Sequence, residues 1–260
     1  MTTNILIPGG AIGGRAAALR YAKSGANVLI ADINTEAGQA LAEELNQNTQ
    51  GRGAFYETDV TSPQSVEALC NHIQETFGHL NHLVSVVGGS LYSDWQGLAD
   101  GKLEDITNTT TLNLLSHQYL MRYTKALLKA CPSTNRSIVL MGSINGMRGF
   151  DLPAYSAAKA GMMGLMYGAA REFTLEHRIR INIVAPGTTL SARTQTLPKS
   201  TEILMQHALL PDMPEAEEIA EAIYTLTHRL PHCTQQTLVI DSGQMAYGPP
   251  HNLLHMQSGA

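Results

Sequence analysis

The sequence predicts an α/β fold, a doubly wound parallel sheet of about seven strands in three α/β/α layers, with residues 1–260 forming a single domain. Two observations support this prediction. Short runs rich in β-branched residues alternate with longer segments of helical pattern, which indicates right-handed crossovers and a parallel sheet covered on both faces. No linker rich in Pro, Gly and Ser divides the chain, and no internal repeat interrupts it.

The strands are expected in short apolar runs, beginning with Ile5-Leu6-Ile7 directly before a glycine-rich loop. They cover 4–7, 27–31, 53–58, 82–87, 137–142, 180–185 and 237–240. The helices are expected between them, at 14–24, 35–47, 63–77, 105–130, 153–176 and 215–228. The segment 188–213 is the exception, because polar and apolar residues are mixed there with several prolines. A loop of this length inside a compact domain is usually functional.

Composition narrows the class of protein. A formal net charge of −5 argues against nucleic acid as the main partner. The three cysteines are far apart in the sequence, which favours free thiols in a reducing compartment. No apolar stretch reaches the roughly 18 residues of a membrane span, and the first residues do not resemble a signal peptide. We therefore expect a soluble, cytoplasmic protein.

A glycine-rich turn between the first strand and the first helix predicts a phosphate-binding loop. Glycines there let the backbone approach a pyrophosphate, whose charge is met by free N–H groups at the helix start. A plain strand-to-helix turn is the alternative. Asp32 ends the second strand, where a carboxylate can accept hydrogen bonds from an adenosine ribose, although an ordinary strand-end acid would look the same. The candidate cofactor contacts in these two strands and the third are Gly9, Gly10, Ile12, Gly13, Gly14, Asp32, Ile33, Asp59 and Val60.

Tyr155 and Lys159 open the helix expected at 153–176, and their i, i+4 spacing places the phenol and the ammonium on one helix face. A free tyrosine titrates near ~10, and a nearby ammonium lowers that pKa and favours proton transfer at neutral pH. Ser143 ends the preceding strand, at the edge of a parallel sheet where ligands bind. Asn113 lies inside the long helix expected at 105–130, where asparagine needs a reason other than helix propensity.

With these residues in order, the chain resembles the short-chain dehydrogenase/reductase family, which has a Rossmann-type fold. The resemblance runs from Ile5 to about Gln244. The family's Ser, Tyr-x-x-x-Lys and helix Asn correspond to Ser143, Tyr155, Lys159 and Asn113. Its Pro-Gly after the sixth strand corresponds to Pro186-Gly187, and its closing Asp-Gly-Gly to Asp241-Ser242-Gly243.

The resemblance implies an enzyme that interconverts a secondary alcohol and its ketone with a nicotinamide cofactor, and Asp32 favours NAD as that cofactor. It implies that Tyr155 is the general acid/base and that Ser143 binds the substrate oxygen. Lys159 would bind the nicotinamide ribose and lower the pKa of Tyr155, while Asn113 would hold a water of the proton relay. It also implies that 188–213 covers the substrate as a lid. Further cofactor contacts implied are Ser85, Val87, Gly88, Tyr155, Lys159, Pro186, Gly187, Thr189 and Ser191.

Two loops depart from the family pattern. Pro8 stands where the family has a threonine, and the glycine loop is one residue short. Ser85-Val86-Val87-Gly88 replaces the family's Asn-Asn-Ala-Gly, which contacts that threonine. Both partners of one contact have therefore changed, which we interpret as a coupled structural change. A weakened cofactor site is the alternative.

Two other functions remain open at this point. One is an NADPH-dependent carbonyl reductase, which Asp32 opposes because its carboxylate repels a 2′-phosphate. The other is a non-catalytic dinucleotide-binding protein, which the complete set of catalytic residue types opposes. No metal site is expected, because the histidine pairs 228/232 and 251/255 lack accompanying ligands and are typical of solvated surface. The two long helices resemble those that the family uses for assembly, so we expect a homotetramer, with a dimer as the alternative.

Overall fold

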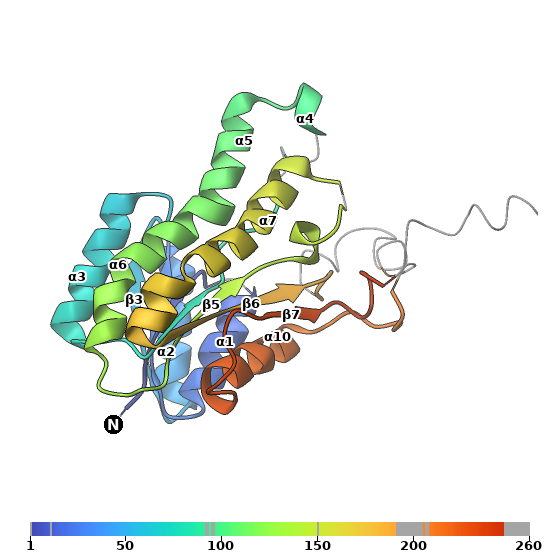
Figure 1. Ribbon diagram of the computed structural model, residues 1–260. Coiled ribbons are helices and arrows are strands. Elements are labelled where there is room, and N and C mark those ends of the chain that lie inside the picture. The colour runs from blue at the N-terminus through green and yellow to red at the C-terminus, as the bar shows by residue number, and fades with distance from the viewer. Residues whose placement is uncertain are drawn as a thin grey trace, which may run out of the picture.

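The computed structural model describes residues 2–10, 12–91, 94, 97–149, 151–190, 205 and 208–246. A seven-stranded parallel sheet forms its centre, in the order β3-β2-β1-β4-β5-β6-β7 (Figure 1). The strands are β1 (Asn4–Pro8), β2 (Asn27–Asp32), β3 (Arg52–Glu57), β4 (His82–Ser85), β5 (Arg136–Met141), β6 (Ile179–Pro186) and β7 (Thr237–Ile240). The predicted Rossmann-type doubly wound sheet is confirmed.

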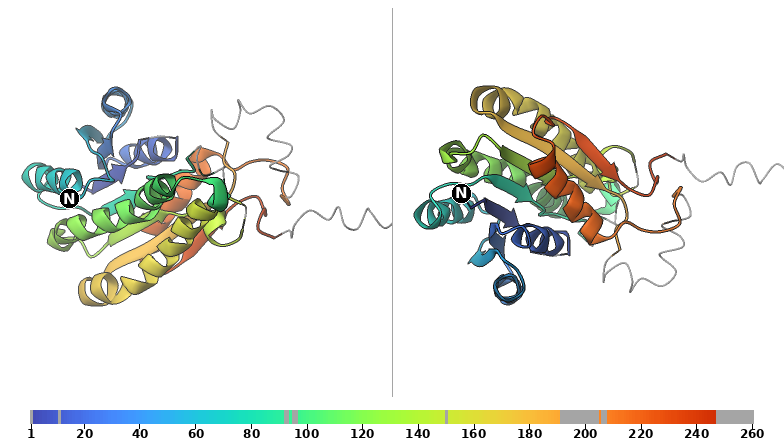
Figure 2. Two further views of the ribbon diagram at one scale, coloured as in Figure 1. Left: turned by 90° about the horizontal axis from the view of Figure 1, so that it is seen from above. Right: turned by 90° about the horizontal axis from the view of Figure 1, so that it is seen from below.

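Helices cover both faces of the sheet (Figure 2). One face carries α1 (Ile12–Ala22), α2 (Thr35–Asn48) and α10 (Ala216–Tyr224). The other carries α3 (Pro63–Thr76), α6 (Ser116–Ala130) and α7 (Pro153–Gly168). Side chains of a strand alternate between the two layers. In β1, Leu6 joins the core under α3 and α6, while Ile5 and Ile7 join the core under α1 and α10.

The long helices differ from their predicted form because each contains a wider, π-helical turn. The segment expected as one helix at 105–130 is α5 (Leu103–Thr110), the π-turn Thr111–Leu115 and α6. Similarly, α7 continues into the π-turn Ala170–Leu175, and α10 into Thr225–Arg229. Such turns often occur at functional positions, and Asn113 lies within the first of them. Two short elements were not predicted, α4 (Gly97–Asp100) and the 3₁₀ turn Ile144–Gly146.

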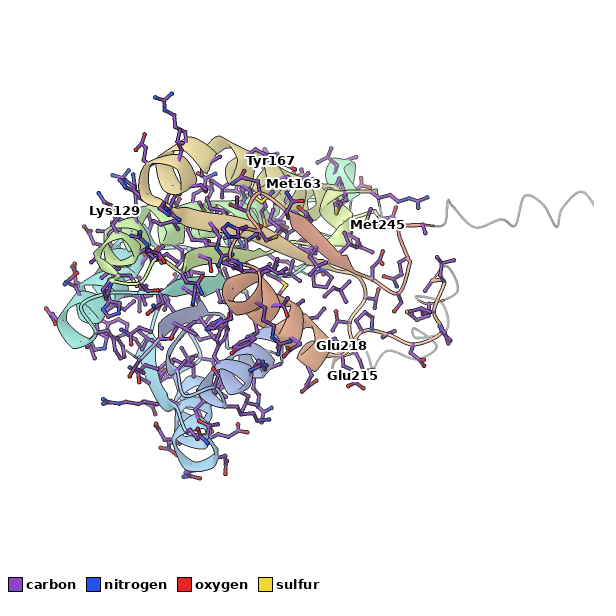
Figure 3. All side chains as sticks on the ribbon, turned by 60° about the horizontal axis from the view of Figure 1, so that its bottom comes forward. Lys129, Met163, Tyr167, Glu215, Glu218 and Met245 are labelled. Carbon is purple, nitrogen blue, oxygen red and sulfur yellow. The ribbon has the colours of Figure 1, made fainter. Side chains whose placement is uncertain are left out.

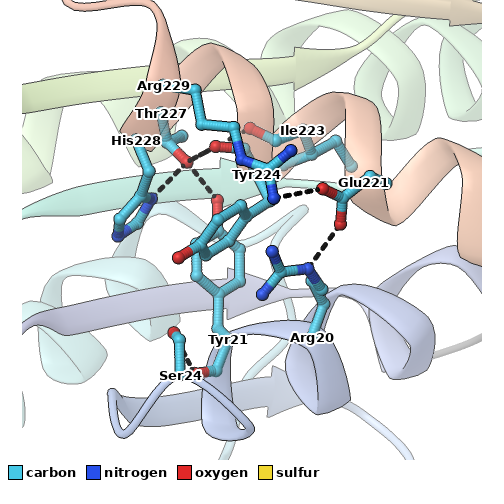
Figure 4. A network of polar contacts seen from close by, with 9 residues as sticks. All are labelled: Arg20, Tyr21, Ser24, Glu221, Ile223, Tyr224, Thr227, His228 and Arg229. Carbon is cyan, nitrogen blue, oxygen red and sulfur yellow. Dashed lines mark hydrogen bonds and ion pairs between the residues drawn. The ribbon is translucent and has the colours of Figure 1, made fainter.

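The amino edge of the sheet is held by a polar and aromatic network between α1 and α10 (Figure 4). The guanidinium carbon of Arg20 lies 3.4 Å from the ring centre of Tyr224, which stacks on His228 at 4.4 Å and 5°. The hydroxyls of Tyr21 and Thr227 lie 2.7 Å apart, and Thr227 also contacts Nδ1 of His228 at 2.8 Å. His228 is therefore not the solvated surface side chain that its sequence spacing suggested. Burial and the charges of Arg20 and Arg180 lower its pKa to about 4.

Among the described residues, no helix is long and apolar enough to cross a membrane. Within the same part of the chain, no three His, Cys, Asp or Glu side chains gather as a metal site would require. His251 and His255 lie outside the described residues.

Candidate active site

The glycine loop lies at the carboxyl end of β1, beside β4, where the order of the strands reverses. Ligands of doubly wound sheets bind at this point. Gly9 has a φ of +91°, and its N–H donates to the Ala31 carbonyl at 2.8 Å. A side chain on Gly14 would place its Cβ 1.7 Å from the Gly9 carbonyl oxygen, so only glycine lets α1 begin this close to the strand. The first turn of α1 carries no acidic residue, which leaves its positive end free for an anion.

Asp32 is half-buried at the end of β2. Its carboxylate faces the glycine loop and also holds it in place. Its Oδ2 accepts the Gly10 N–H at 2.7 Å, and its Oδ1 accepts the Asn34 N–H at 3.0 Å. Next to it, Ile33 is 69% exposed, which is unusual for a large apolar side chain at a strand end. An exposed apolar side chain beside a carboxylate fits a nucleoside, which has a flat base and a hydroxylated sugar.

Asp59 and Val60 follow β3 along the same edge. The Asp59 carboxylate accepts from the Thr61 N–H at 2.9 Å and from the Thr61 hydroxyl at 2.6 Å, so it shapes the turn before α3. Val60 is buried in the core. Their contact with an adenine ring stays a prediction, as does that of Ile12, whose side chain lies outside the described part.

Tyr155 and Ser143 come together as predicted from the sequence. Ser143 follows β5, and the Tyr155 hydroxyl reaches it from the first turn of α7 through a side-chain hydrogen bond. The Ser143 hydroxyl also accepts the Asn145 N–H at 3.2 Å, which fixes its direction at the start of the 3₁₀ turn. A phenol and a hydroxyl joined in this way can hold one carbonyl or alcohol oxygen between them.

Lys159 lies one turn after Tyr155 and is only 3% exposed. Its Nζ donates to the Met141 carbonyl at 2.8 Å and lies 5.7 Å from the centre of the Tyr155 ring. Asn113 is fully buried, and its side-chain amide pairs with the main chain of Gly89, donating to the carbonyl at 3.0 Å and accepting from the N–H at 2.8 Å. Asn113 thus holds the end of β4 against the helix that carries it.

Gly88 lies between these two side chains, with a φ of +119°. A Cβ at this position would come within 2.5 Å of Asn113 Oδ1 and 3.0 Å of Lys159 Nζ. The structure therefore places Asn113, Ser143, Tyr155 and Lys159 at one edge of the sheet, and Gly88 permits the approach of Asn113 and Lys159.

The charges in this cluster differ from the sequence-based expectation. Burial raises the pKa of Tyr155, the Ser143 hydrogen bond lowers it, and the charge of Asp94 raises it. In this structure burial outweighs the hydrogen bond, so the net direction of the Tyr155 pKa is upward. The lowering of this pKa by the Lys159 ammonium stays a prediction. Burial lowers the pKa of Lys159 from 10.5 to about 7. Lys159 is therefore only partly protonated at neutral pH.

Ser85 was expected to contact the cofactor, but its side chain faces the core. It is fully buried, and its hydroxyl lies 2.7 Å from Nδ1 of His117, which is also fully buried. His117 follows Asn113 by one helical turn, so both residues bind the loop after β4. Burial and the charge of Lys159 hold the pKa of His117 well below its usual value. Sequence reasoning missed His117, although the i, i+4 spacing from Asn113 is a signal that could have found it.

At the other side of the site, Gly187 follows β6 and donates to the Ile240 carbonyl at 2.8 Å. The Thr189 hydroxyl donates to the Gly187 carbonyl at 3.2 Å. Pro186, Gly187 and Thr189 thus lie at the predicted edge of the sheet, and their contacts with a cofactor stay predictions. Ser191 and much of the expected lid, including Arg193, Leu197, Ile203 and Leu204, lie outside the described residues.

The comparisons with known proteins agree with this geometry. The family model described as Enoyl-(Acyl carrier protein) reductase matches residues 11–245. The 3-oxoacyl-[acyl-carrier-protein] reductase of Mus musculus is 32% identical over 231 residues, which cover 88% of this chain and 92% of that protein. Carbonyl reductase family member 4 of Danio rerio is 31% identical, over 94% of this chain and 98% of that protein. A short-chain type dehydrogenase/reductase structure from Mycobacterium ulcerans has a TM-score of 0.85 at 22% identity, covers 97% of this chain and 93% of that one, and supports the fold alone.

Fold, site and relatives together define an oxidoreductase of the dinucleotide-binding class. The chain belongs to the short-chain dehydrogenase/reductase family. The residues present fit the nicotinamide dinucleotide that this family binds. The close approach of Gly14 to Gly9 and the acid-free start of α1 leave the positive helix end for the diphosphate, and Asp32 lies where the adenosine ribose is expected.

Proposed function

We propose that the protein is an NAD-dependent oxidoreductase that interconverts a secondary alcohol and its ketone. The observation that carries this proposal is the hydrogen-bonded pair Tyr155–Ser143, with Lys159 buried one helical turn away. When bound, the nicotinamide ring would accept or donate the hydride. Asp32, Gly9, Gly14 and the start of α1 would hold the adenosine and diphosphate portions.

In this proposal the residues of the chain hold the substrate oxygen and move its proton. Ser143 and Tyr155 would share a hydrogen bond with that oxygen, and the Tyr155 hydroxyl would give its proton to the oxygen during ketone reduction. The raised pKa of Tyr155 keeps the phenol protonated, which suits this direction. In alcohol oxidation Tyr155 must instead be the base, and a protonated Lys159 beside it would favour its phenolate form.

The preference for NAD over NADP rests on Asp32. Both carboxylate oxygens accept hydrogen bonds from backbone N–H groups, which fix the direction of the side chain at this place. A fixed negative charge at the ribose position repels a 2′-phosphate, and Ile33 and Asn34 supply no compensating cation.

The relatives favour a second candidate, the reduction of a 3-oxoacyl thioester, because the mouse relative is named for that reaction. Either reaction would use the same four residues. A carbonyl reductase that uses NADPH would be the corresponding alternative for the cofactor.

The substrate is expected to be medium-sized and largely apolar. Of the apolar residues of 188–213 that support this, Leu190, Met205, Leu209 and Leu210 are described. Leu209 and Leu210 are 56% and 62% exposed. Arg148, one of two arginines that could have bound a substrate carboxylate, donates instead to the Met245 carbonyl at 2.7 Å. We therefore expect cyclic or aryl secondary alcohols to be oxidised more efficiently than glycerol-sized polyols or sugars.

We also propose that the protein forms a homotetramer, with a dimer as the alternative. A groove runs between α6 and the end of α7, lined by residues that include Met121, Tyr123, Leu165 and Phe173. Beside it Tyr167, on α7, is 59% exposed (Figure 3). The groove is also lined by Gln118, Arg122 and Glu172. A mixed polar and apolar surface of this kind on a helix pair suits burial against a second copy. Light scattering coupled to size-exclusion chromatography would give the oligomeric state.

The function is tested by titrating NADH and NADPH against the protein and then measuring turnover. The panel contains secondary alcohols, their ketones and acetoacetyl-coenzyme A. Tyr155→Phe should lose all but a few per cent of turnover and bind NADH almost normally, because the change removes only the phenolic hydroxyl. Larger residual activity would contradict the assignment of Tyr155. Turnover of the thioester alone would favour the second candidate.

A further inference from the structure

The six residues after β7, Asp241–Ala246, form a compact turn with its own hydrogen bonds. The carboxylate of Asp241 accepts the Gly243 N–H and the Met245 N–H, both at 2.8 Å. The Gln244 N–H donates to the Asp241 carbonyl at 3.0 Å. Asp241 therefore fixes the path of the chain, so that residues carried by the turn are held in defined directions.

This turn contacts two segments at the edge of the candidate active site. The Oε1 of Gln244 accepts the Thr188 N–H at 2.9 Å, just after Pro186-Gly187. The Met245 carbonyl accepts from Arg148 at 2.7 Å, and Arg148 belongs to the loop that also carries Ser143. Met245 lies past the end of β7 (Figure 3).

The same turn also binds the segment 208–214, at the carboxyl end of the stretch expected to cover the substrate. The Ser242 carbonyl accepts the N–H groups of Leu209 at 2.8 Å and Leu210 at 3.0 Å. The Ser242 hydroxyl donates to the Asp212 carbonyl at 2.6 Å. Three hydrogen bonds from one residue therefore hold this segment, and the Leu209 side chain packs against the adjacent Gly243.

Ser242 holds this position in a conformation that favours glycine. Its φ is +52°, in the left-handed region, and the matching position of the family motif is the first glycine of Asp-Gly-Gly. A serine there has an unfavourable backbone but gains a hydroxyl that glycine lacks. That hydroxyl is hydrogen-bonded to the main chain of the segment 208–214. The residue that departs from the family motif therefore also makes the contact that a glycine could not make.

We propose that Ser242 is a positioning residue for the substrate side of the active site. It holds 208–214 to the turn Asp241–Ala246. Arg148 joins this turn to the Ser143 loop, and Gln244 joins it to Thr188. The distance between the substrate-covering segment and Ser143 is thereby fixed from one turn. The effect on catalysis rests on the proposed function, whereas the attachment of 208–214 does not.

Two substitutions separate the hydroxyl from the backbone conformation. Ser242→Ala removes the hydroxyl and keeps the unfavourable φ, while Ser242→Gly removes the hydroxyl and relieves it. Ser24→Ala is the matched control, because the Ser24 hydroxyl donates to the Tyr21 carbonyl at the same 2.6 Å, at the opposite edge of the sheet. Amide hydrogen exchange of Leu209 and Leu210 reads the attachment without any substrate.

We expect both Ser242 variants to exchange these two amides about fivefold faster, the effect of losing one hydrogen bond of ordinary strength. Tm should fall in Ser242→Ala and stay equal or rise in Ser242→Gly. With a ketone substrate and NADH, KM for the ketone should rise severalfold in both, while the Kd of NADH stays within twofold. Ser24→Ala should change none of these except Tm.

Unchanged exchange in both variants would overturn the proposal. So would a change confined to Ser242→Gly, because the effect would then follow the backbone conformation and not the lost hydroxyl. Faster exchange with an unchanged KM would overturn the positioning role. A wild-type protein that turns over no alcohol, ketone or thioester would contradict the proposed function, and exchange would still decide whether Ser242 holds 208–214.

Discussion

Lys159 is expected to lower the free energy of unfolding of the protein. Replacing Lys159 with methionine makes this effect measurable. Burial lowers the pKa of Lys159 from 10.5 to about 7. Each whole unit of that difference corresponds to about 1.4 kcal/mol, so protonated Lys159 costs the folded state about 5 kcal/mol relative to the unfolded chain. Lys159→Met removes this cost and fills similar space with an apolar side chain.

The variant also loses the hydrogen bond from Lys159 to the Met141 carbonyl, at 2.8 Å. A hydrogen bond from a charged donor is worth about 1.5–3 kcal/mol, so we expect a net gain of roughly 2–3 kcal/mol at pH 6. For a chain of this size each kcal/mol raises Tm by about 2–4 °C.

The sign of the pH dependence follows from the two pKa values. Above about pH 10.5 the amine is neutral in both states and contributes no penalty. As pH falls from there to about 7, the unfolded chain binds a proton that the folded protein does not, so wild-type stability decreases. Below pH 7 both states are protonated and the penalty is constant. The advantage of Lys159→Met should therefore be full at pH 6 and disappear towards pH 10.

Urea unfolding at pH 6, 7, 8.5 and 10 gives the free energies of unfolding. Lys129→Met is the control, because Lys129 is an exposed lysine in the last turn of α6 (Figure 3) and should show no such pH dependence. A Lys159→Met variant that is less stable than wild type at pH 6 would refute the reasoning. So would a stability difference that does not change between pH 6 and pH 10.

Three further predictions concern the cofactor loop and the end of β4. Asp32→Ala should weaken NADH binding, because the Gly10 N–H loses its acceptor. We expect the wild type to prefer NAD over NADP by at least about tenfold, and Asp32→Ala should reduce this preference. Equal use of both cofactors by the wild type would contradict the prediction. Gly88→Ala should lower kcat by about a hundredfold or more, because its Cβ would meet Asn113 and Lys159, whereas Gly89→Ala, with a φ of +145° but open space, should lose stability only. Ser85→Ala should cost about 1–3 kcal/mol of stability by leaving a buried imidazole nitrogen unpaired, and His117→Leu in the same chain should recover part of that loss; additive free energies of unfolding would refute the coupling.

The sequence was sufficient for the parts of the structure that depend on periodic patterns. Buried strands such as Ile138–Leu140 are apolar on both faces, and their alternation with helices determined the sheet. The candidate catalytic residues could also be identified from the sequence, because Tyr155 and Lys159 are close in sequence and Ser143 ends a recognisable strand. A residue at the end of a strand is predicted to lie at one edge of the sheet. Residues at the same edge are predicted to lie close together.

What the sequence could not provide depends on packing between distant segments. The π-turn at Thr111–Leu115 has no distinct sequence pattern, because it is stabilised by tertiary contacts such as the pairing of Asn113 with Gly89. The charge state of Lys159 depends on burial, which spacing does not give. The contact of Ser242 with Asp212 joins residues 30 positions apart across the edge of the sheet.

The departures at Pro8 and at Ser85-Val86-Val87-Gly88 illustrate how such packing replaces a sequence motif. The main-chain link between the two strands remains, because the Val86 N–H donates to the Pro8 carbonyl at 3.1 Å, and proline lacks only the donor. The Val86 side chain lies 3.0 Å from where a Cβ of Gly14 would be, so an apolar contact occupies the place beside the loop. Ser85 turns to the buried His117, and Asn113 binds Gly89, so the end of β4 is held from the helix. These contacts favour the interpretation of a coupled change, in which α6 and the π-turn before it support the loop. The approach of Gly88 to Lys159 remains.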